Sequence, residues 1–212
     1  MLTIKQFTFN PIQENTYVIF ENKGECFIID PGCYSEEERK ELTDFIDMNT
    51  LVPKGLLNTH GHLDHIFGNK YIAERYALPV RIHEKEKPVL EQAPDAAIRW
   101  GLPFDNYNGE IIALEAGEDV VLGKYHFRVL FTPGHSPGSV SLYCEKEKIV
   151  IAGDVLFRLG IGRTDLGGGD YNVLIESIRE QLFSLPDEVT VYPGHGPQTT
   201  IGYEKKNNPF LV

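Results

Sequence analysis

The stretch THGHLDH, Thr59 to His65, places three histidines and one aspartate within seven residues. Imidazole and carboxylate groups at this density are typical of a metal site, although a polar loop would explain any single histidine equally well. The preceding residues KGLLNT form a short apolar run, which predicts a β-strand leading directly into the histidines. A metal site requires that other parts of the chain bring ligands to the same place.

Three further ligand-type residues stand in the same kind of position. His135 follows RVLFTPG, Asp154 follows IVIAG, and His195 follows VTVYPG. Each therefore comes just past the carboxyl end of an apolar strand, as the first histidines do, and a glycine stands beside it. Because the carboxyl ends of neighbouring strands can meet at one edge of a sheet, we expect these side chains to lie close together.

The residue types in this group predict two metal ions. The candidate ligands are His60, His62, Asp64, His65, His135, Asp154 and His195. Five histidines and two aspartates exceed what one tetrahedral ion can hold, and a carboxylate such as Asp154 can bridge two cations. Zinc suits this set, and iron and manganese accept the same ligands. Two ions about 3.5–4 Å apart would share a water and lower its pKa toward neutrality.

The first half of the chain reads as strands followed by helices. Apolar and β-branched runs predict strands at Thr3–Phe9, Thr16–Glu21, Glu25–Asp30 and Pro79–His83. A capping box of Ser35 and Glu38 opens a predicted amphipathic helix over 35–48, and further helices are predicted over 69–77 and from Glu84. The segment 93–109 contains Pro94, Pro103 and several Gly and Asn residues, which favour an irregular loop or lid that either contacts substrate or only connects elements.

The second half repeats this order. Strands are predicted at Asp119–Leu122, Tyr125–Phe131, Ser139–Glu145, Lys148–Asp154 and Glu188–Gly194, with a glycine-rich loop over 159–170 and a helix over 171–185. Strands first and helices later, in each half, predict two sheets packed together with helices outside. We therefore expect an α/β fold in a single domain, residues 1–212.

Composition excludes several classes of partner. The net charge of −11 and the absence of clustered basic residues argue against nucleic acid, and no apolar run approaches the ~20 residues that span a bilayer. The three cysteines lack CxxC spacing, which favours a reduced compartment. The amino-terminal run MLTIKQFTFN alternates apolar and polar residues and predicts a strand instead of a signal peptide. We expect a cytoplasmic protein without membrane partners.

The combined pattern resembles the metallo-β-lactamase superfamily. THGHLDH matches the His-x-His-x-Asp-His signature of that family, and His135, Asp154 and His195 follow in the family's order. The resemblance covers essentially the whole chain and implies a four-layer αββα sandwich. Within the superfamily, GDVLFRLGIGRTDLGGGD, YPGHGPQTT and GYEKKNNPF are similar to the glyoxalase II group of hydroxyacylglutathione hydrolases, in its short bacterial form.

The resemblance also implies roles for single residues. The first metal would be bound by His60, His62 and His135, the second by Asp64, His65 and His195, and both by Asp154. A hydroxide held between the two metals and oriented by Asp64 would then hydrolyse a thioester such as lactoylglutathione. Arg163, in the family's Gly-Arg pair, would contact an anionic substrate tail; its alternative is a structural ion pair with Asp165 or Asp170.

Other activities stay open at this point. Longer glyoxalase II enzymes carry a helical domain that binds glutathione, and the resemblance ends at Val212 without one. The thiol part of the expected thioester substrate, glutathione or another thiol, is therefore open. Persulfide dioxygenases share this fold and a GRTD segment but use a single iron, and lactonases would use the same hydroxide to open a ring. A binding protein that had lost turnover would lack a ligand, and none is missing. The oligomeric state is open.

Overall fold

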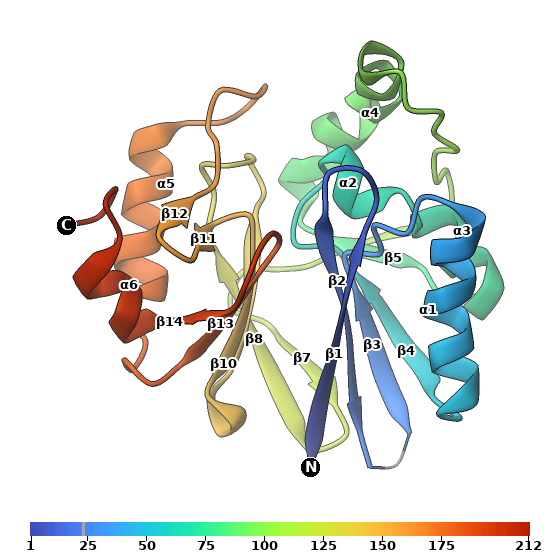
Figure 1. Ribbon diagram of the computed structural model, residues 1–212, viewed down its shortest axis with the longest axis horizontal. Coiled ribbons are helices and arrows are strands. Elements are labelled where there is room, and N and C mark those ends of the chain that lie inside the picture. The colour runs from blue at the N-terminus through green and yellow to red at the C-terminus, as the bar shows by residue number, and fades with distance from the viewer. Residues whose placement is uncertain (23) are drawn as a thin grey trace.

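Two six-stranded β-sheets face each other in the computed structural model, which describes residues 1–22 and 24–212 (Figure 1). The first sheet has the order β1-β2-β3-β4-β5-β6, with β1 (Leu2–Phe9), β2 (Glu14–Glu21), β3 (Glu25–Ile29), β4 (Val52–Leu57), β5 (Val80–Ile82) and β6 (Ile111–Ala113). The second has the order β14-β13-β10-β9-β8-β7, with β7 (Asp119–Leu122), β8 (Tyr125–Phe131), β9 (Val140–Cys144), β10 (Ile149–Gly153), β13 (Thr190–Pro193) and β14 (Thr199–Thr200). A small ribbon consists of β11 (Leu156–Phe157) and β12 (Gly160–Ile161).

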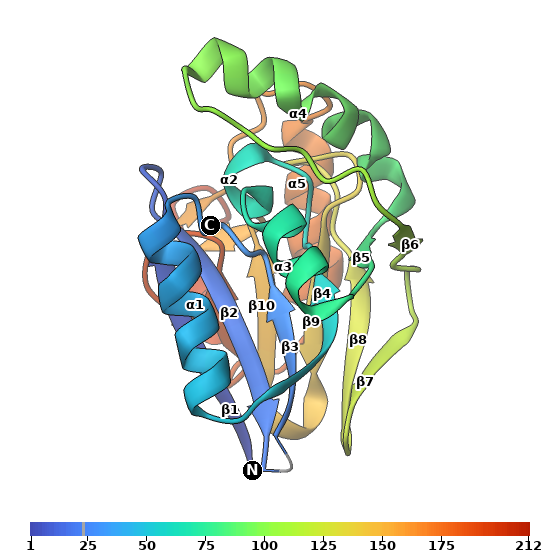
Figure 2. The same cartoon turned by 90° about the vertical axis from the view of Figure 1, so that its right-hand side faces the viewer.

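Helices cover the outer faces of both sheets. The first sheet is covered by α1 (Glu36–Met48) and α3 (Asn69–Tyr76), and the second by α5 (Tyr171–Ser177), the π-helical turn η3 (Ile178–Leu182) and α6 (Ile201–Asn207) (Figure 1). Beyond one end of the sheets lie α2 (Leu63–Ile66) and α4 (Lys87–Trp100), which Figure 2 shows from the side. Two short 3₁₀ turns, η1 (Glu84–Glu86) and η2 (Glu145–Glu147), complete the elements.

The alternation of side chains along the strands explains the layers. Successive residues of a strand point to opposite faces. Tyr17 and Ile19 of β2 therefore pack with Phe127 of β8 in the apolar cluster between the sheets, whereas Val18 packs with Leu42 of α1 on the outer face. A third apolar cluster joins β10 and β13 to α5 and α6. The predicted αββα sandwich is confirmed.

The strand directions place one set of strand ends at a common edge. Strands β3, β4, β5 and β6 run parallel, and β10 runs parallel to β13. At this edge the tip of the β1–β2 hairpin touches the second sheet. The Asn15 N–H donates to the Gly194 carbonyl at 2.7 Å, and the backbones of Glu14 and His195 form an isolated antiparallel β-bridge. The two sheets are thus held together where the predicted ligands emerge.

Local signals predicted some elements well. The capping box is confirmed: Ser35 Oγ accepts from the Glu38 N–H, and the Glu38 carboxylate accepts from the Ser35 N–H. The predicted helix over 69–77 is found as α3. The three cysteines are free and buried.

The interpretation of 93–109 as irregular throughout is wrong. Helix α4 continues to Trp100 with Pro94 inside it, and only the residues after Gly101 are irregular. Pro94 removes one helical hydrogen bond. Ala93 and Ala97 nevertheless hold the helix in place, because they pack against the apolar side chains of α2. Gly101 takes a left-handed conformation with φ of 67° and ends the helix.

Across the residues that the structure describes, we find no helix with the length and apolar character that a membrane crossing requires.

Candidate metal centre

Four segments at the common edge supply the seven predicted ligands. The first histidine loop follows β4, His135 follows β8, Asp154 follows β10 and His195 follows β13. In each of two groups of three side chains, the candidate ligand atoms lie within 4.8 Å of one another, and Asp154 contacts both groups. Crowding here explains one glycine, since a Cβ at Gly194 would lie 2.0 Å from Asp154 Oδ1. The structure brings all seven residues together.

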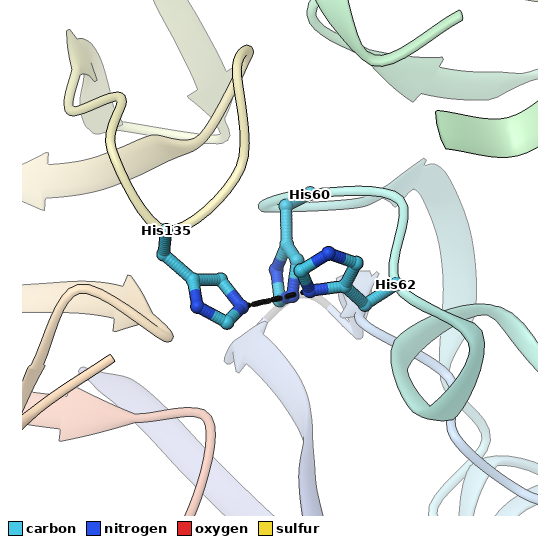
Figure 3. Close-up of side chains that lie close together, drawn as sticks. All are labelled: His60, His62 and His135. Atoms are coloured by element: carbon cyan, nitrogen blue, oxygen red, sulfur yellow. Dashed lines mark hydrogen bonds between the residues drawn. The ribbon is translucent and has the colours of Figure 1, made fainter. Parts of the chain in front are cut away.

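The first group is His60, His62 and His135, whose rings converge from two loops (Figure 3). His62 Nδ1 lies 2.8 Å from His135 Nε2, which in turn lies 3.3 Å from His60 Nε2. Nitrogens bound at 2.0–2.1 Å to a tetrahedral zinc ion would be roughly 3.3 Å apart. The spacing of these three nitrogens is therefore close to that of a metal ligand set.

The second group is Asp64, His65 and His195. His195 Nε2 lies 3.2 Å from Asp64 Oδ2, and His65 Nε2 lies 3.8 Å from the same oxygen. Asp64 and His65 belong to the short helix α2, which begins directly after His62. The first two side chains of the His-x-His-x-Asp-His pattern thus belong to the first group, and the last two belong to the second.

Asp154 stands between the two groups. Its Oδ2 lies 3.5 Å from His135 Nε2 of the first group and 3.5 Å from His195 Nε2 of the second. Its Oδ1 lies 3.4 Å from His65 Nε2. One carboxylate therefore faces the ligand atoms of both groups, which is the placement that a bridging ligand needs.

The far ring nitrogens of the histidines are held by oxygens. His65 Nδ1 lies 3.1 Å from Asp30 Oδ2, and His60 Nδ1 lies 3.1 Å from Thr59 Oγ1, which donates to the same Asp30 oxygen at 2.6 Å. A metal-binding histidine commonly donates its second N–H in this way, and the contact fixes which nitrogen keeps its lone pair. Asp30 thus supports a histidine of each group.

Backbone carbonyls do the same for the other loops. His135 Nδ1 donates to the carbonyl of Arg163 at 2.7 Å, and His195 Nδ1 donates to the carbonyl of Gln13 at 3.2 Å. With Nδ1 as the donor, Nε2 of each ring presents its lone pair to the centre. The polypeptide therefore sets the tautomers that metal binding requires.

Two buried polar atoms at the centre have no hydrogen-bond partner among the described residues. They are His65 Nε2 and Asp154 Oδ1, which face each other at 3.4 Å. A buried polar atom without a partner is costly and needs an explanation. A cation between such atoms would satisfy both, so the residues present fit a pair of divalent metal ions.

Burial and neighbouring charge shift the pKa values of the histidines in opposite directions. Burial is the main cause that lowers the pKa of His60 far below its usual value and that of His62 to about 3, and it also lowers the pKa of His135. In the second group burial acts in the same direction, but the Asp154 and Asp64 carboxylates outweigh it and raise the pKa of His65 and His195. Protons therefore compete with metal ions for the histidines of the second group at higher pH than for those of the first.

This difference predicts stepwise loss of metal on acidification. Between pH 7 and pH 5, bound zinc or cobalt should fall from two ions toward one per chain, because His65 and His195 take up protons before His60 and His62 do. Equilibrium dialysis across this range measures the occupancy. A His195→Ala variant should show only the step at lower pH; simultaneous release of both ions from the wild-type protein would contradict the prediction.

A cavity of about 440 Å³ opens at the centre. His62, Asp64, His135, Asp154 and His195 form its floor, and α4 forms a wall with Val89, Gln92, Ala93, Ala96, Arg99 and Trp100. The hairpin tip, the β11–β12 ribbon, the glycine-rich loop and the first histidine loop complete the lining with Ile12, Phe157, Ile161, Arg163, Leu166, Gly167, Gly61 and Leu63. Most of the wall is apolar, and two guanidinium groups, those of Arg99 and Arg163, stand among it. A small substrate can therefore reach the ligand cluster.

Two roles were predicted for Arg163: contact with an anionic substrate tail, or a structural ion pair. It lines the cavity, and its Nε and Nη2 also donate to Asp165 at 2.6 and 2.8 Å. The ion pair with Asp165 is therefore present, whereas no pair with Asp170 forms among the described contacts, since Asp170 instead caps α5. The role of Arg163 in substrate binding stays a prediction.

Sequence reasoning missed several residues around the centre. Asp30 and Glu14 are buried carboxylates that lie beside His65, at 3.1 and 3.8 Å. Asp30 follows β3 as Asp154 follows β10, so its place at a strand end was a signal that could have revealed it. The part of α4 from Ala93 was predicted as a loop or lid that contacts substrate or only connects elements, whereas the structure places it in the cavity wall as a helix.

Comparison with known proteins agrees with this fold and site. The sequence model of the metallo-beta-lactamase superfamily matches residues 9–195. The chain is 38% identical to the probable metallo-hydrolase YqgX of Bacillus subtilis over 98% of this chain and 96% of that protein. It is 37% identical to the hydroxyacylglutathione hydrolase GloC of Haemophilus influenzae over 99% of this chain and 98% of that protein.

Solved structures are similar over the whole chain. The B3 metallo-beta-lactamase BLEG-1 is 39% identical with a TM-score of 0.91, covering 99% of this chain and 100% of that one. TTHA1623, solved in a di-iron-bound form, is 40% identical with a TM-score of 0.88, covering 98% and 100%. ETHE1 from Myxococcus xanthus is 28% identical with a TM-score of 0.79, covering 98% and 83%. From its fold, its ligand cluster and these relatives, the chain belongs to the metallo-beta-lactamase superfamily.

Proposed function

We propose that this protein is a hydrolase that uses two divalent metal ions, with zinc as the first candidate, to cleave thioesters such as lactoylglutathione. The observation that carries the proposal is the convergence of seven ligand side chains, five of which form the floor of an open cavity, with Asp154 facing both groups. The similarity to GloC, whose name states hydroxyacylglutathione hydrolysis, supports this choice of substrate.

The ligand residues and Asp64 divide the work of hydrolysis. Two divalent metal ions, when bound, supply a water of lowered pKa and positive charge for the tetrahedral oxyanion. Asp64 lies in the cavity floor, and nearby His65 lowers its pKa in spite of burial, so it is ionised at neutral pH. An ionised Asp64 accepts a hydrogen bond from the attacking water and orients it toward the acyl carbon.

The lining of the cavity favours a thiolate leaving group. Among the described residues that line it, the only carboxyl groups are Asp64 and Asp154, and both face the ligand histidines. Neither is free to protonate a leaving group. An amine or alkoxide leaves poorly without a proton, whereas a thiolate with a pKa near 8.5 leaves without one. A thioester therefore matches the groups present better than an amide or an ordinary ester does.

The decisive experiment assays one metal-loaded preparation against several substrates. Lactoylglutathione, a lactone, a β-lactam and glutathione persulfide are tested in parallel, with metal content measured on the same sample. We expect two ions per chain and the highest kcat/KM for lactoylglutathione. A single iron with oxygen uptake on the persulfide would replace this proposal by a dioxygenase, and preferential turnover of the lactone or β-lactam would replace the substrate class.

The two arginines of the cavity supply a further prediction about the substrate. Arg99 is exposed in the wall and forms no ion pair with any carboxylate that the structure describes, whereas Arg163 pairs with Asp165. An exposed charge pair contributes about 1 kcal/mol, so Arg99→Gln should raise the KM for lactoylglutathione roughly fivefold with kcat unchanged.

Steady-state kinetics with a charged and a neutral thioester measure this effect. Arg163→Gln should raise KM less, because its guanidinium is already shared with Asp165. The neutral thioester is the control, since neither substitution should change its KM. Equal changes for both substrates would show that the arginines shape the wall without binding an anionic group.

A further inference from the structure

Glu86 is a buried carboxylate that the proposed metal set does not use. It ends the η1 turn immediately before α4, and its side chain is completely buried, with an exposed fraction of 0%. A buried carboxylate requires hydrogen-bond donors or a cation. Its donors come from the two loops that hold the first group of histidines.

The first donor belongs to the His60 loop. The N–H of Gly61, which stands between His60 and His62, donates to Glu86 Oε2 at 2.7 Å. The backbone between two of the three ligands is therefore fixed to this carboxylate. No side-chain hydrogen bond caps the start of α2 at His62, so the neighbouring Gly61 contact is one that holds the backbone there.

The other donors belong to the His135 loop. Ser136 Oγ lies 2.6 Å from both carboxylate oxygens, and the N–H of Gly138 donates to Oε1. The loop approaches so closely that a Cβ at Gly138 would lie 2.9 Å from Glu86 Cγ. This close approach explains why position 138 is glycine.

Glu86 therefore joins two loops whose histidines are far apart in the sequence but only 2.8 to 3.3 Å apart in space. A metal ion at this site would need a lone pair from each of the three rings, and three converging lone pairs would repel one another until the cation is bound. Something outside the three rings must hold them in place, and the hydrogen bonds to Glu86 connect the backbone on both sides.

We propose that Glu86 is a positioning residue for the first metal: by accepting hydrogen bonds from Gly61, Ser136 and Gly138, it holds His60 and His62 against His135 before the ion arrives. This inference rests on the proposed metal centre and is independent of the proposed thioester substrate. A preformed ligand set binds its ion more tightly because less order is lost on binding.

The test is Glu86→Gln, which keeps the size of the side chain but turns one acceptor into a donor. That NH₂ group must face one of the three donors, so one contact between the loops is lost. Zinc affinity of the first site, measured by competition with a chromophoric chelator, should fall about 10- to 100-fold. The visible spectrum of the cobalt-loaded variant should change as well, since it reports ligand geometry.

Glu204→Gln is the matched control. Glu204 is also completely buried and accepts from a backbone N–H, a hydroxyl and an amide, those of Leu159, Thr199 and Asn208. It lies in α6, away from the histidines. Its substitution should lower the melting temperature but leave zinc affinity and the cobalt spectrum as in the wild type.

The outcomes separate the two proposals. If the wild-type protein binds no zinc, the proposed metal centre is wrong. If the wild type binds zinc and Glu86→Gln binds it equally well with the same cobalt spectrum, the positioning role is wrong and the metal centre stands. Should Glu86→Gln fail to fold, Ser136→Ala removes a single donor and is expected to give a smaller loss of affinity in the same direction; an unchanged affinity there also overturns the role.

Discussion

Replacing Asp154 by alanine should lower kcat/KM for lactoylglutathione by roughly 10²- to 10³-fold, the scale of losing a main electrostatic contact to a transition state. Asp154 faces His135 and His195 at 3.5 Å each and His65 at 3.4 Å, so its removal takes negative charge from both proposed metal sites at once. The same histidines lower the pKa of Asp154 in spite of its burial, which means that the carboxylate is ionised and available as a ligand.

The measurement combines kinetics with metal analysis and circular dichroism. We expect the variant to fold, because Asp154 stands at a strand end and belongs to none of the apolar clusters. Its metal content should fall below two ions per chain. Asp187→Asn, which changes an exposed aspartate paired with Lys205, should leave activity and metal content unchanged. Retained turnover by Asp154→Ala with both ions bound would rule out the bridging role.

The ligand cluster was predictable because its members share a position relative to strands. His135, Asp154 and His195 each follow an apolar run. Their strand ends share one edge because β10 runs parallel to β13, and because β8 and β10 are both antiparallel to β9. A short-range pattern and a general property of sheets were therefore sufficient. The capping box of α1 is similarly local, since Ser35 and Glu38 are three residues apart.

The residues that were missed depend on contacts between distant segments. Asp30 shares the strand-end position, but the Thr59 N–H from which it accepts is 29 positions away. Glu86 is a single carboxylate outside that pattern, and the N–H groups of Gly61 and Gly138 from which it accepts are 25 and 52 positions away. The carbonyl of Arg163 holds His135, yet a backbone carbonyl has no signature in the sequence. In α4, Pro94 and Gly101 suggested an irregular segment, whereas packing of the helix against α2 outweighs that local preference.

Removing metal from the wild-type protein should both abolish turnover and lower the melting temperature by roughly 8–16 °C. Ligands that bind only the folded chain stabilise it by about 4 kcal/mol at 1,000 times their dissociation constant. For a chain of this size each kcal/mol shifts the melting temperature by about 2–4 °C. Dialysis against a chelator, followed by a thermal melt with and without added zinc, measures both effects on one sample.

The charge within the centre explains why this stabilisation should be large. Glu14, Asp30, Asp64 and Asp154 gather around the buried ring of His65. Burial raises the pKa of Glu14 well above its usual value, and the nearby Asp30 and Asp64 carboxylates raise it further. Protonation of His65 and Glu14, whose pKa values are both raised, offsets part of this charge in the metal-free chain. His65 Nε2 and Asp154 Oδ1 nevertheless lack a hydrogen-bond partner among the described residues, and bound cations would satisfy both.

Asp154→Ala provides the matching control for the thermal experiment. With Asp154 gone, the metal-free state loses one unpartnered buried acceptor, and the cations that remain bound are held less tightly. Chelation should therefore lower its melting temperature by less than it lowers that of the wild type. The wild-type protein could instead melt at the same temperature with and without chelator, at full loss of metal. That result would show that the polypeptide itself satisfies the histidines and carboxylates, and that their convergence serves another purpose than binding cations.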